Sequence, residues 1–180
     1  MNSKLIVMLG NSITEGGGDW AQKMGNKHLV NSGISGDNVS GVFDRLDEIT
    51  KGKPKKIFLK IGVNDVSDHQ TSDFIVSRIA EIVEKIKSDS PHKLVYIQSL
   101  LPINESIGIY TQLNGRSSQI KEINTKLKAL AINWNLSYID LYPLFTEPGT
   151  QTLRADLTED GLHIAEDGYK IWREELKKYL

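Results

Sequence analysis

The sequence contains no cysteine. This absence excludes disulfide bonds, thiolate metal ligands and a cysteine nucleophile together, although it does not identify the compartment. Any side chain that attacks a substrate covalently must therefore use oxygen or nitrogen.

Long apolar runs and an excess of one charge are also missing. No apolar stretch approaches the roughly 20 residues that a membrane-spanning helix needs, so we expect no membrane span. The 22 Lys and Arg residues nearly balance the 23 Asp and Glu residues, giving a formal net charge of -1. This balance does not favour nucleic acid or anionic lipid as a partner.

The first residues lack the basic start, long apolar middle and small-residue cleavage site of a signal peptide. We expect a cytoplasmic location if the chain is complete, and a secreted or periplasmic one if a signal peptide was removed.

What the sequence does contain is an alternation of short apolar runs with amphipathic stretches. A chain of 180 residues, 39% of them apolar, is expected to form one domain, residues 1–180. The runs predict strands at residues 5–9, 29–30, 57–61, 94–97 and 136–139, and the clearest helical patterns cover residues 73–87, 118–134 and 166–179. Because parallel strands need long crossover connections, we predict an α/β fold, a three-layer α/β/α, flavodoxin-like arrangement around a five-stranded parallel sheet.

Polar motifs follow the predicted strands, where ligands bind in open parallel sheets. Three come after strands and one precedes the last helix: Gly10-Asn11-Ser12-Ile13-Thr14, Asn31-Ser32-Gly33-Ile34-Ser35-Gly36, Gly62-Val63-Asn64-Asp65 and Asp160-Gly161-Leu162-His163. We expect them to meet along one edge of the sheet.

These motifs contain the groups that hydrolysis of an ester requires. Ser12 can serve as nucleophile and His163 as its base. In a helical turn, the spacing of three residues would let Asp160 accept the Nδ1 proton of His163, so that Nε2 can accept from Ser12. The backbone N–H groups of Ser12 and Gly33 and the side-chain amide of Asn64 can form the oxyanion hole.

Each motif also has an ordinary structural explanation when taken alone. Ser12 could cap a helix, Gly33 could permit a tight turn, and Asn64 could belong to a turn. His163 alone is more often structural than catalytic. Only the conjunction of the four motifs, in this order, favours a hydrolase.

The four motifs resemble those of the SGNH hydrolases, also called GDSL-like lipases and acylhydrolases. The resemblance runs nearly end to end and maps the family's serine, glycine, asparagine and histidine onto Ser12, Gly33, Asn64 and His163, with Asp160 as the acid of the triad. It implies a flavodoxin-like fold and no metal or other cofactor. The chain departs from the usual Gly-Asp-Ser by carrying Asn11, which removes a charge beside the nucleophile but keeps hydrogen-bonding capacity.

Other classes of protein fit the sequence less well. An α/β-hydrolase would need a second glycine where Thr14 stands. Three consecutive glycines at residues 16–18 lack the rest of a nucleotide-binding motif, and His28, His69, His92 and His163 lack paired metal-ligand spacing. A non-catalytic binding module on the same fold remains an alternative.

The expected partner is a small-molecule ester. Residues 99–117 form a long connection with several apolar side chains that can line a cleft or support a homodimer. Without room for a large lid, we expect short acyl groups, and acetyl above all, on an alcohol that is a carbohydrate, a lipid or another compound. This agrees with a resemblance to compact acetylhydrolases of the platelet-activating-factor type and to carbohydrate acetylesterases. The alternative is a lysophospholipase or thioesterase that prefers longer acyl groups.

Overall fold

The computed structural model describes residues 4–89 and 94–180, which form a five-stranded sheet with helices on both faces. All strands are parallel and their order is β2-β1-β3-β4-β5. The strands are β1 (Ile6–Gly10), β2 (Leu29–Gly33), β3 (Lys56–Lys60), β4 (Leu94–Gln98) and β5 (Ser137–Ile139). The predicted fold class is confirmed.

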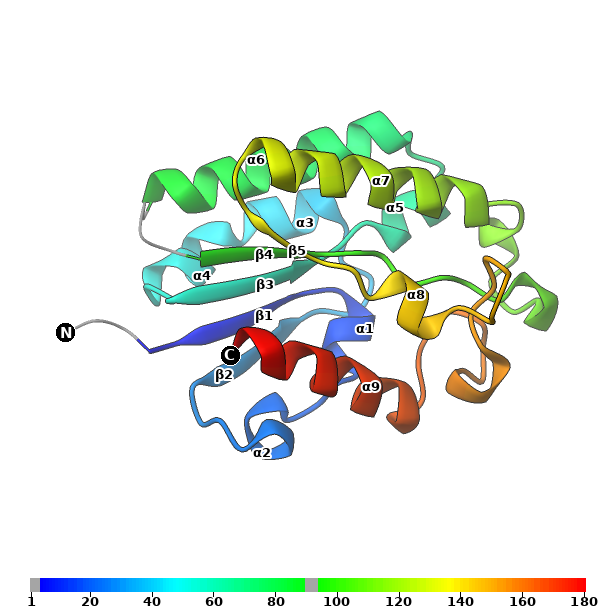
Figure 1. The fold of residues 1–180 in the computed structure, drawn as a ribbon. Helices are drawn as coiled ribbons and strands as arrows, with labels where there is room; N and C mark the ends of the chain where they lie inside the picture. Colours follow the sequence, from blue (N-terminus) through cyan, green and yellow to red (C-terminus); the bar gives the residue numbers. More distant parts are fainter. Residues whose placement is uncertain (1–3, 90–93) are drawn as a thin grey trace.

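Figure 1 shows two helical layers around this sheet. One layer holds α3 (Val39–Asp44), α4 (Leu46–Lys51), α5 (Val63–Ser67), α6 (Ser72–Asp89) and α7 (Ser117–Asn133). The other holds α1 (Ser12–Glu15), α2 (Trp20–Met24) and α9 (Glu166–Leu176), and α8 (Tyr142–Phe145) lies beyond the end of β5. Short 3₁₀ turns are η1 (Glu105–Ile107), η2 (Thr111–Leu113), η3 (Ala155–Leu157) and η4 (Lys177–Tyr179).

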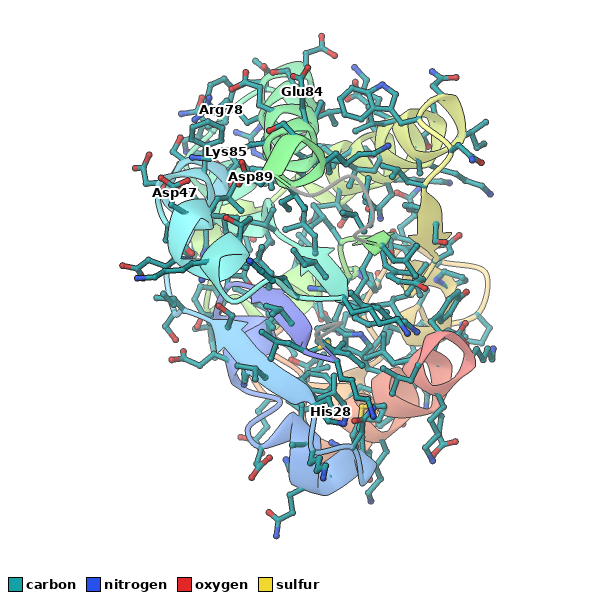
Figure 2. The ribbon with its side chains drawn as sticks, turned by 90° about the vertical axis from the view of Figure 1, so that its left-hand side faces the viewer. His28, Asp47, Arg78, Glu84, Lys85 and Asp89 are labelled. Atoms are coloured by element: carbon teal, nitrogen blue, oxygen red, sulfur yellow. The ribbon has the colours of Figure 1, made fainter. Side chains whose placement is uncertain are left out.

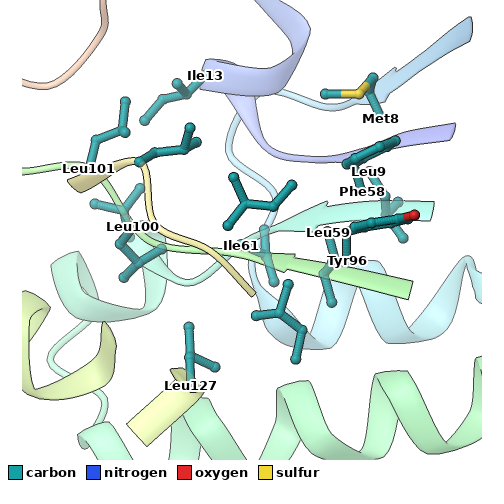
Figure 3. Packing of buried hydrophobic residues seen from close by; sticks show 14 of the residues in the cluster. Met8, Leu9, Ile13, Phe58, Leu59, Ile61, Tyr96, Leu100, Leu101 and Leu127 are labelled. Atoms are coloured by element: carbon teal, nitrogen blue, oxygen red, sulfur yellow. The ribbon is translucent and has the colours of Figure 1, made fainter. Parts of the chain in front are cut away.

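The apolar runs become central strands because both of their faces are covered. Met8, Phe58 and Tyr96 occupy matching positions across β1, β3 and β4, and the rings of Phe58 and Tyr96 stack with centroids 4.6 Å apart. Leu9 and Leu59 form the next row and point to the opposite face. These side chains belong to one continuous core (Figure 3).

The amphipathic stripe of α6 buries Ile75, Ile79 and Ile82, as its spacing predicts. The helix begins at Ser72, and the hydroxyl of Thr71 caps it by accepting the N–H of Phe74 at 3.2 Å.

The outer surface of α6 carries charge. Figure 2 shows Arg78 and Lys85 of α6 on the same side of the molecule as Asp47 of α4. Lys85 Nζ lies 2.7 Å from Asp47 Oδ1, an exposed ion pair of small energetic effect.

Parallel pairing brings the carboxyl ends of β1, β2 and β3 to one edge of the sheet. Gly10 lies opposite Gly33 on one side and opposite Lys60 on the other. The loops that follow these strands lie together at the right of Figure 1. Within the described residues, no helix is long and apolar enough to cross a bilayer.

Candidate active site

The turn from β1 into α1 places Ser12 at this edge. Gly10 is required there because a Cβ would lie 2.3 Å from Thr14 Oγ1 and 2.4 Å from the carbonyl oxygen of Lys60. Asn11 is buried and caps α1, with its Oδ1 accepting the N–H of Ile13 at 3.1 Å. A neutral amide therefore does the capping at this buried position.

The structure brings Ser12, His163 and Asp160 together. Ser12 Oγ lies 2.9 Å from His163 Nε2, and His163 Nδ1 lies 2.7 Å from Asp160 Oδ2. With Nδ1 protonated, the imidazole would donate to Asp160 and accept from the hydroxyl of Ser12. This is the arrangement that can activate a serine hydroxyl.

Asp160 and His163 do not share a helical turn, contrary to the expectation from their spacing. Gly161 has a φ of +84°, and Asp160 Oδ1 accepts the N–H groups of Leu162 at 2.9 Å and His163 at 2.7 Å. An aspartate-centred turn therefore holds the pair, with one carboxylate oxygen on the backbone and the other on the imidazole.

These contacts also affect the ionisation of Asp160. Burial favours its neutral form, but the hydrogen bonds from Leu162 and from the side chain and backbone of His163, with the charge interaction to His163, together outweigh burial and leave the pKa of Asp160 below its usual value. The carboxylate is therefore charged at neutral pH.

Asn64 reaches the site from the first turn of α5. Its Nδ2 donates one hydrogen to the carbonyl oxygen of Asp37 at 2.7 Å, which leaves the second hydrogen of the amide for a ligand. Arg45 in turn fixes Asp37, since its Nε donates to Asp37 Oδ2 at 2.8 Å. The same guanidinium donates to the carbonyl oxygens of Gly10 at 3.1 Å and Ser32 at 3.0 Å.

The two glycines of the second motif differ in their surroundings. The N–H of Gly33 donates to Asn31 Oδ1 at 3.0 Å, and a Cβ on Gly33 would lie 2.2 Å from the backbone nitrogen of Glu15. Gly36 has a φ of +79°, lines the cavity beside Ser12, and its N–H has no partner among the described residues. Position favours Gly36 over Gly33 as a donor to a ligand.

An open cavity of about 280 Å³ adjoins Ser12. Its lining combines apolar side chains with neutral polar ones and the imidazole of His163. The lining residues are Ser12, Ser35, Gly36, Val63, Asn64, Ser67, Tyr110, Gln112, Leu113, Leu162 and His163.

Tyr110 belongs to the 99–117 segment, which was expected to line a cleft. Its hydroxyl lies 3.4 Å from Asp160 Oδ2 and 3.3 Å from His163 Nδ1, and its ring meets the imidazole edge to face at 5.7 Å. Burial, and then the charge of Asp160, raise the pKa of Tyr110. The hydroxyl therefore remains a donor at neutral pH.

Asp65, beside Asn64, has a structural role. Both of its carboxylate oxygens accept the N–H of Val39, at 3.1 and 3.3 Å, and burial raises its pKa to about 6. In residues 4–89 and 94–180, no three His, Cys, Asp or Glu side chains gather as a metal site. His92, considered above as a ligand, lies outside the described residues.

Comparison with known families gives a match along most of the chain. The model of the GDSL-like lipase/acylhydrolase family matches residues 8–171. Among individual proteins, the chain is 25% identical over 152 residues to platelet-activating factor acetylhydrolase IB subunit alpha1 of Bos taurus. The alignment covers 83% of this chain and 62% of that protein, so the chain spans less than two thirds of that relative.

Solved structures share the fold. A GDSL-like lipase from Bacteroides thetaiotaomicron superposes with a TM-score of 0.87 at 23% identity, covering 98% of this chain and 87% of that one. The acetyl xylan esterase AlAXEase superposes with a TM-score of 0.79 at 21% identity, covering 97% of this chain and 98% of that one. At these identities the likeness shows the fold alone.

Proposed function

The chain belongs to the GDSL-like lipase/acylhydrolase family, and from this premise we propose that it hydrolyses short-chain carboxylic esters with Ser12 as nucleophile. One observation carries the proposal: the hydroxyl of Ser12 lies at a cavity and 2.9 Å from an imidazole whose other nitrogen faces a carboxylate. His163 is the proposed base and Asp160 the group that orients it.

In the acylation half of the reaction, His163 Nε2 accepts the proton of Ser12 as Oγ attacks the ester carbonyl carbon. The resulting tetrahedral intermediate collapses, and the imidazolium donates that proton to the departing alcohol. Asp160 stabilises the imidazolium without taking its proton. An acyl group remains on Ser12.

In deacylation, His163 takes a proton from water, which attacks the acyl carbon. The second intermediate releases the carboxylic acid, and the proton returns to Ser12 Oγ. Deacylation is the reverse of acylation with water in place of the alcohol. His163 therefore acts first as a base and then as an acid in both halves.

The proposed oxyanion hole consists of the N–H of Ser12, the N–H of Gly36 and the side-chain amide of Asn64. The sequence suggested Gly33 for the glycine position, but the N–H of Gly33 is bonded to Asn31. Gly36 supports the role better because it lines the cavity with Ser12 and Asn64. In our proposal Gly33 serves close packing of β2 against α1.

Acetyl is the proposed acyl group. The cavity of about 280 Å³ is small for a ligand site and opens to solvent, which favours a short acyl chain. Two similar proteins, an acetylhydrolase and an acetyl xylan esterase, support this choice. A lysophospholipase or thioesterase would need space for a longer chain.

A series of p-nitrophenyl esters tests the proposal. We expect kcat/KM to fall from acetate to butyrate to octanoate, and Ser12→Ala to abolish release of p-nitrophenol from all three. A preference for octanoate would favour the alternative with longer acyl groups. Absence of Ser12-dependent turnover in well-folded protein would favour a non-catalytic binding module.

A further inference from the structure

We propose that Tyr110, Gln112 and Ser67 form a subsite for the alcohol half of the ester, and that this half is a neutral, hydroxylated ring such as a sugar. The inference rests on the proposed function, because the place of the alcohol half is deduced from the proton transfer between His163 and the leaving oxygen.

The proton route decides where the alcohol lies. The leaving oxygen must receive its proton from His163 Nε2, so the alcohol half leaves on the His163 side of Ser12. Tyr110 forms the wall on that side, with its ring against the imidazole of His163. Gln112 follows two residues later in η2 and lines the same cavity.

Ser67 approaches this region from α5. It lies three residues after Asn64, a spacing that places both side chains on one face of a helix, and both line the cavity. Because α5 and η2 are in contact, Ser67 and Gln112 belong to neighbouring walls. A ligand between them can be reached from both.

The chemistry of these walls suits a hydroxylated ring. The side chains of Gln112 and Ser67 have no hydrogen-bond partner in the part of the chain that the structure describes, so both can bind a ligand. Each can donate and accept, as a hydroxyl does. Tyr110 adds an aromatic surface on which the C–H groups of a ring can pack.

Charge argues against an ionic alcohol. Among the described residues, none that lines the cavity is Lys, Arg, Asp or Glu. A phosphate or quaternary ammonium group would therefore find no counter-ion in this lining. The hydroxyls of a neutral sugar would find donors and acceptors there.

The test compares esters that share the acetyl group and differ in the alcohol: a mono-O-acetylated methyl glycoside, p-nitrophenyl acetate and a 2-acetyl glycerophosphocholine. We expect the wild type to hydrolyse the glycoside with a higher kcat/KM than the phospholipid. In Gln112→Leu and Ser67→Ala, kcat/KM on the glycoside should fall roughly three- to tenfold each, the usual effect of one hydrogen bond. Activity on p-nitrophenyl acetate, whose ring has no hydroxyl to bond, should fall by less, so the ratio of kcat/KM on the glycoside to kcat/KM on p-nitrophenyl acetate should drop in both variants.

Gln22→Leu, on the exposed face of α2, is the matched control and should change neither activity. Thermal melting of each variant verifies folding. Two results would overturn the subsite: a wild type that prefers the phospholipid, or variants that lose both activities equally or lose neither. In both cases, Ser12-dependent turnover of p-nitrophenyl acetate would still support the proposed esterase. Loss of that turnover from the wild type would remove both proposals.

Discussion

The two oxygens of Asp160 bind different partners. Oδ1 accepts two backbone N–H groups of its own turn, and Oδ2 faces His163 Nδ1 with the hydroxyl of Tyr110 beside it. The backbone bonds fix the carboxylate, so the direction of the imidazole follows from the turn itself. Tyr110 is a residue that sequence reasoning placed only within a cleft-lining segment.

Tyr110→Phe tests whether the hydroxyl of Tyr110 affects the reactivity of His163, the proposed base. Removing the donor leaves more negative charge on Asp160 Oδ2, which stabilises the imidazolium of His163. We expect the acidic limb of the kcat/KM profile on p-nitrophenyl acetate to move to higher pH, and only slightly because the contact is long. The retained ring should keep KM within about twofold.

The matched control is Tyr142→Phe, whose hydroxyl donates to the carbonyl oxygen of Gln151 away from the cavity. Its profile should be that of the wild type. An equal loss of rate at every pH in Tyr110→Phe would show that the hydroxyl serves packing and leaves the base unaffected.

Some features of single residues could not be predicted from the sequence. Asp160 and His163 could be paired from their spacing, but their turn depends on a positive φ at Gly161 that no apolar pattern reveals. The sequence alone does not distinguish the roles of Gly33 and Gly36. Only the packing of β2 against α1 separates the one whose N–H is occupied from the one that lines the cavity.

At the scale of elements, Arg45 joins the ends of two strands to the loop that carries Gly36. It lies where α3 meets α4, and its guanidinium contacts the backbone of Gly10 and Ser32 and the carboxylate of Asp37. The carbonyl group of Asp37 then holds the amide of Asn64. Arg45 is thus a positioning residue for the proposed oxyanion hole.

Arg45→Lys keeps the charge and removes the planar fork that allows these contacts. We expect kcat on p-nitrophenyl acetate to fall about tenfold with little change in KM, because the donors would be misplaced for the transition state more than for the substrate. Asn64→Ala, which removes a donor itself, should cost roughly 10²- to 10³-fold.

Arg78→Lys, at an exposed ion pair on α6, is the control for Arg45→Lys and should leave kcat unchanged. A rise in KM at constant kcat in Arg45→Lys would mean that the arginine shapes substrate binding and not the oxyanion hole.

The elements themselves were largely predictable because each is amphipathic or uniformly apolar over its own length. The run at residues 5–9 and the stripe of α6 both needed only local periodicity. The cap at Thr71 could not be predicted, because three polar residues in a row, Thr71, Ser72 and Asp73, are all suitable caps. Arg45 could not be identified from sequence, since its partners come from separate segments.

At the scale of the whole molecule, a lysine lies within the core beneath the site. Lys60 is 1% exposed, its ammonium lies 5.3 Å from the ring centroid of Trp172, and burial lowers its pKa to about 7. Between about pH 7 and pH 10.5 the unfolded chain holds a proton on this lysine that the folded chain lacks. The contribution of Lys60 to the free energy of unfolding therefore rises with pH through that window.

Lys60→Met should remove this dependence and stabilise the protein most below pH 7. The shift of the pKa from 10.5 to about 7 sets an upper limit of about 5 kcal/mol on the gain in the free energy of unfolding. The energy of the lost contact with Trp172 reduces this gain. Urea unfolding at pH 6, 8 and 10 measures the effect, with the exposed Lys121→Met as control. Equal stabilisation at all three pH values would show that folding does not lower the pKa of Lys60.

The homodimer considered from the apolar 99–117 segment stays a prediction. Ile109 in that segment is 59% exposed, which leaves an apolar side chain beside Tyr110 available for contact. Light scattering of the wild type and of Ile109→Ser would decide whether this side chain supports association.

Hydrolysis by the proposed mechanism requires that the hydroxyl of Ser12 be far more reactive than every other hydroxyl of the chain. The most direct measurement is mass-spectrometric mapping of the residue modified by diethyl p-nitrophenyl phosphate, an organophosphate that mimics the tetrahedral intermediate. We predict a single diethylphosphoryl group on Ser12, formed at least 100-fold more slowly in His163→Ala and absent in Ser12→Ala. Stoichiometric labelling of any other residue, or undiminished labelling of Ser12→Ala, would contradict the account.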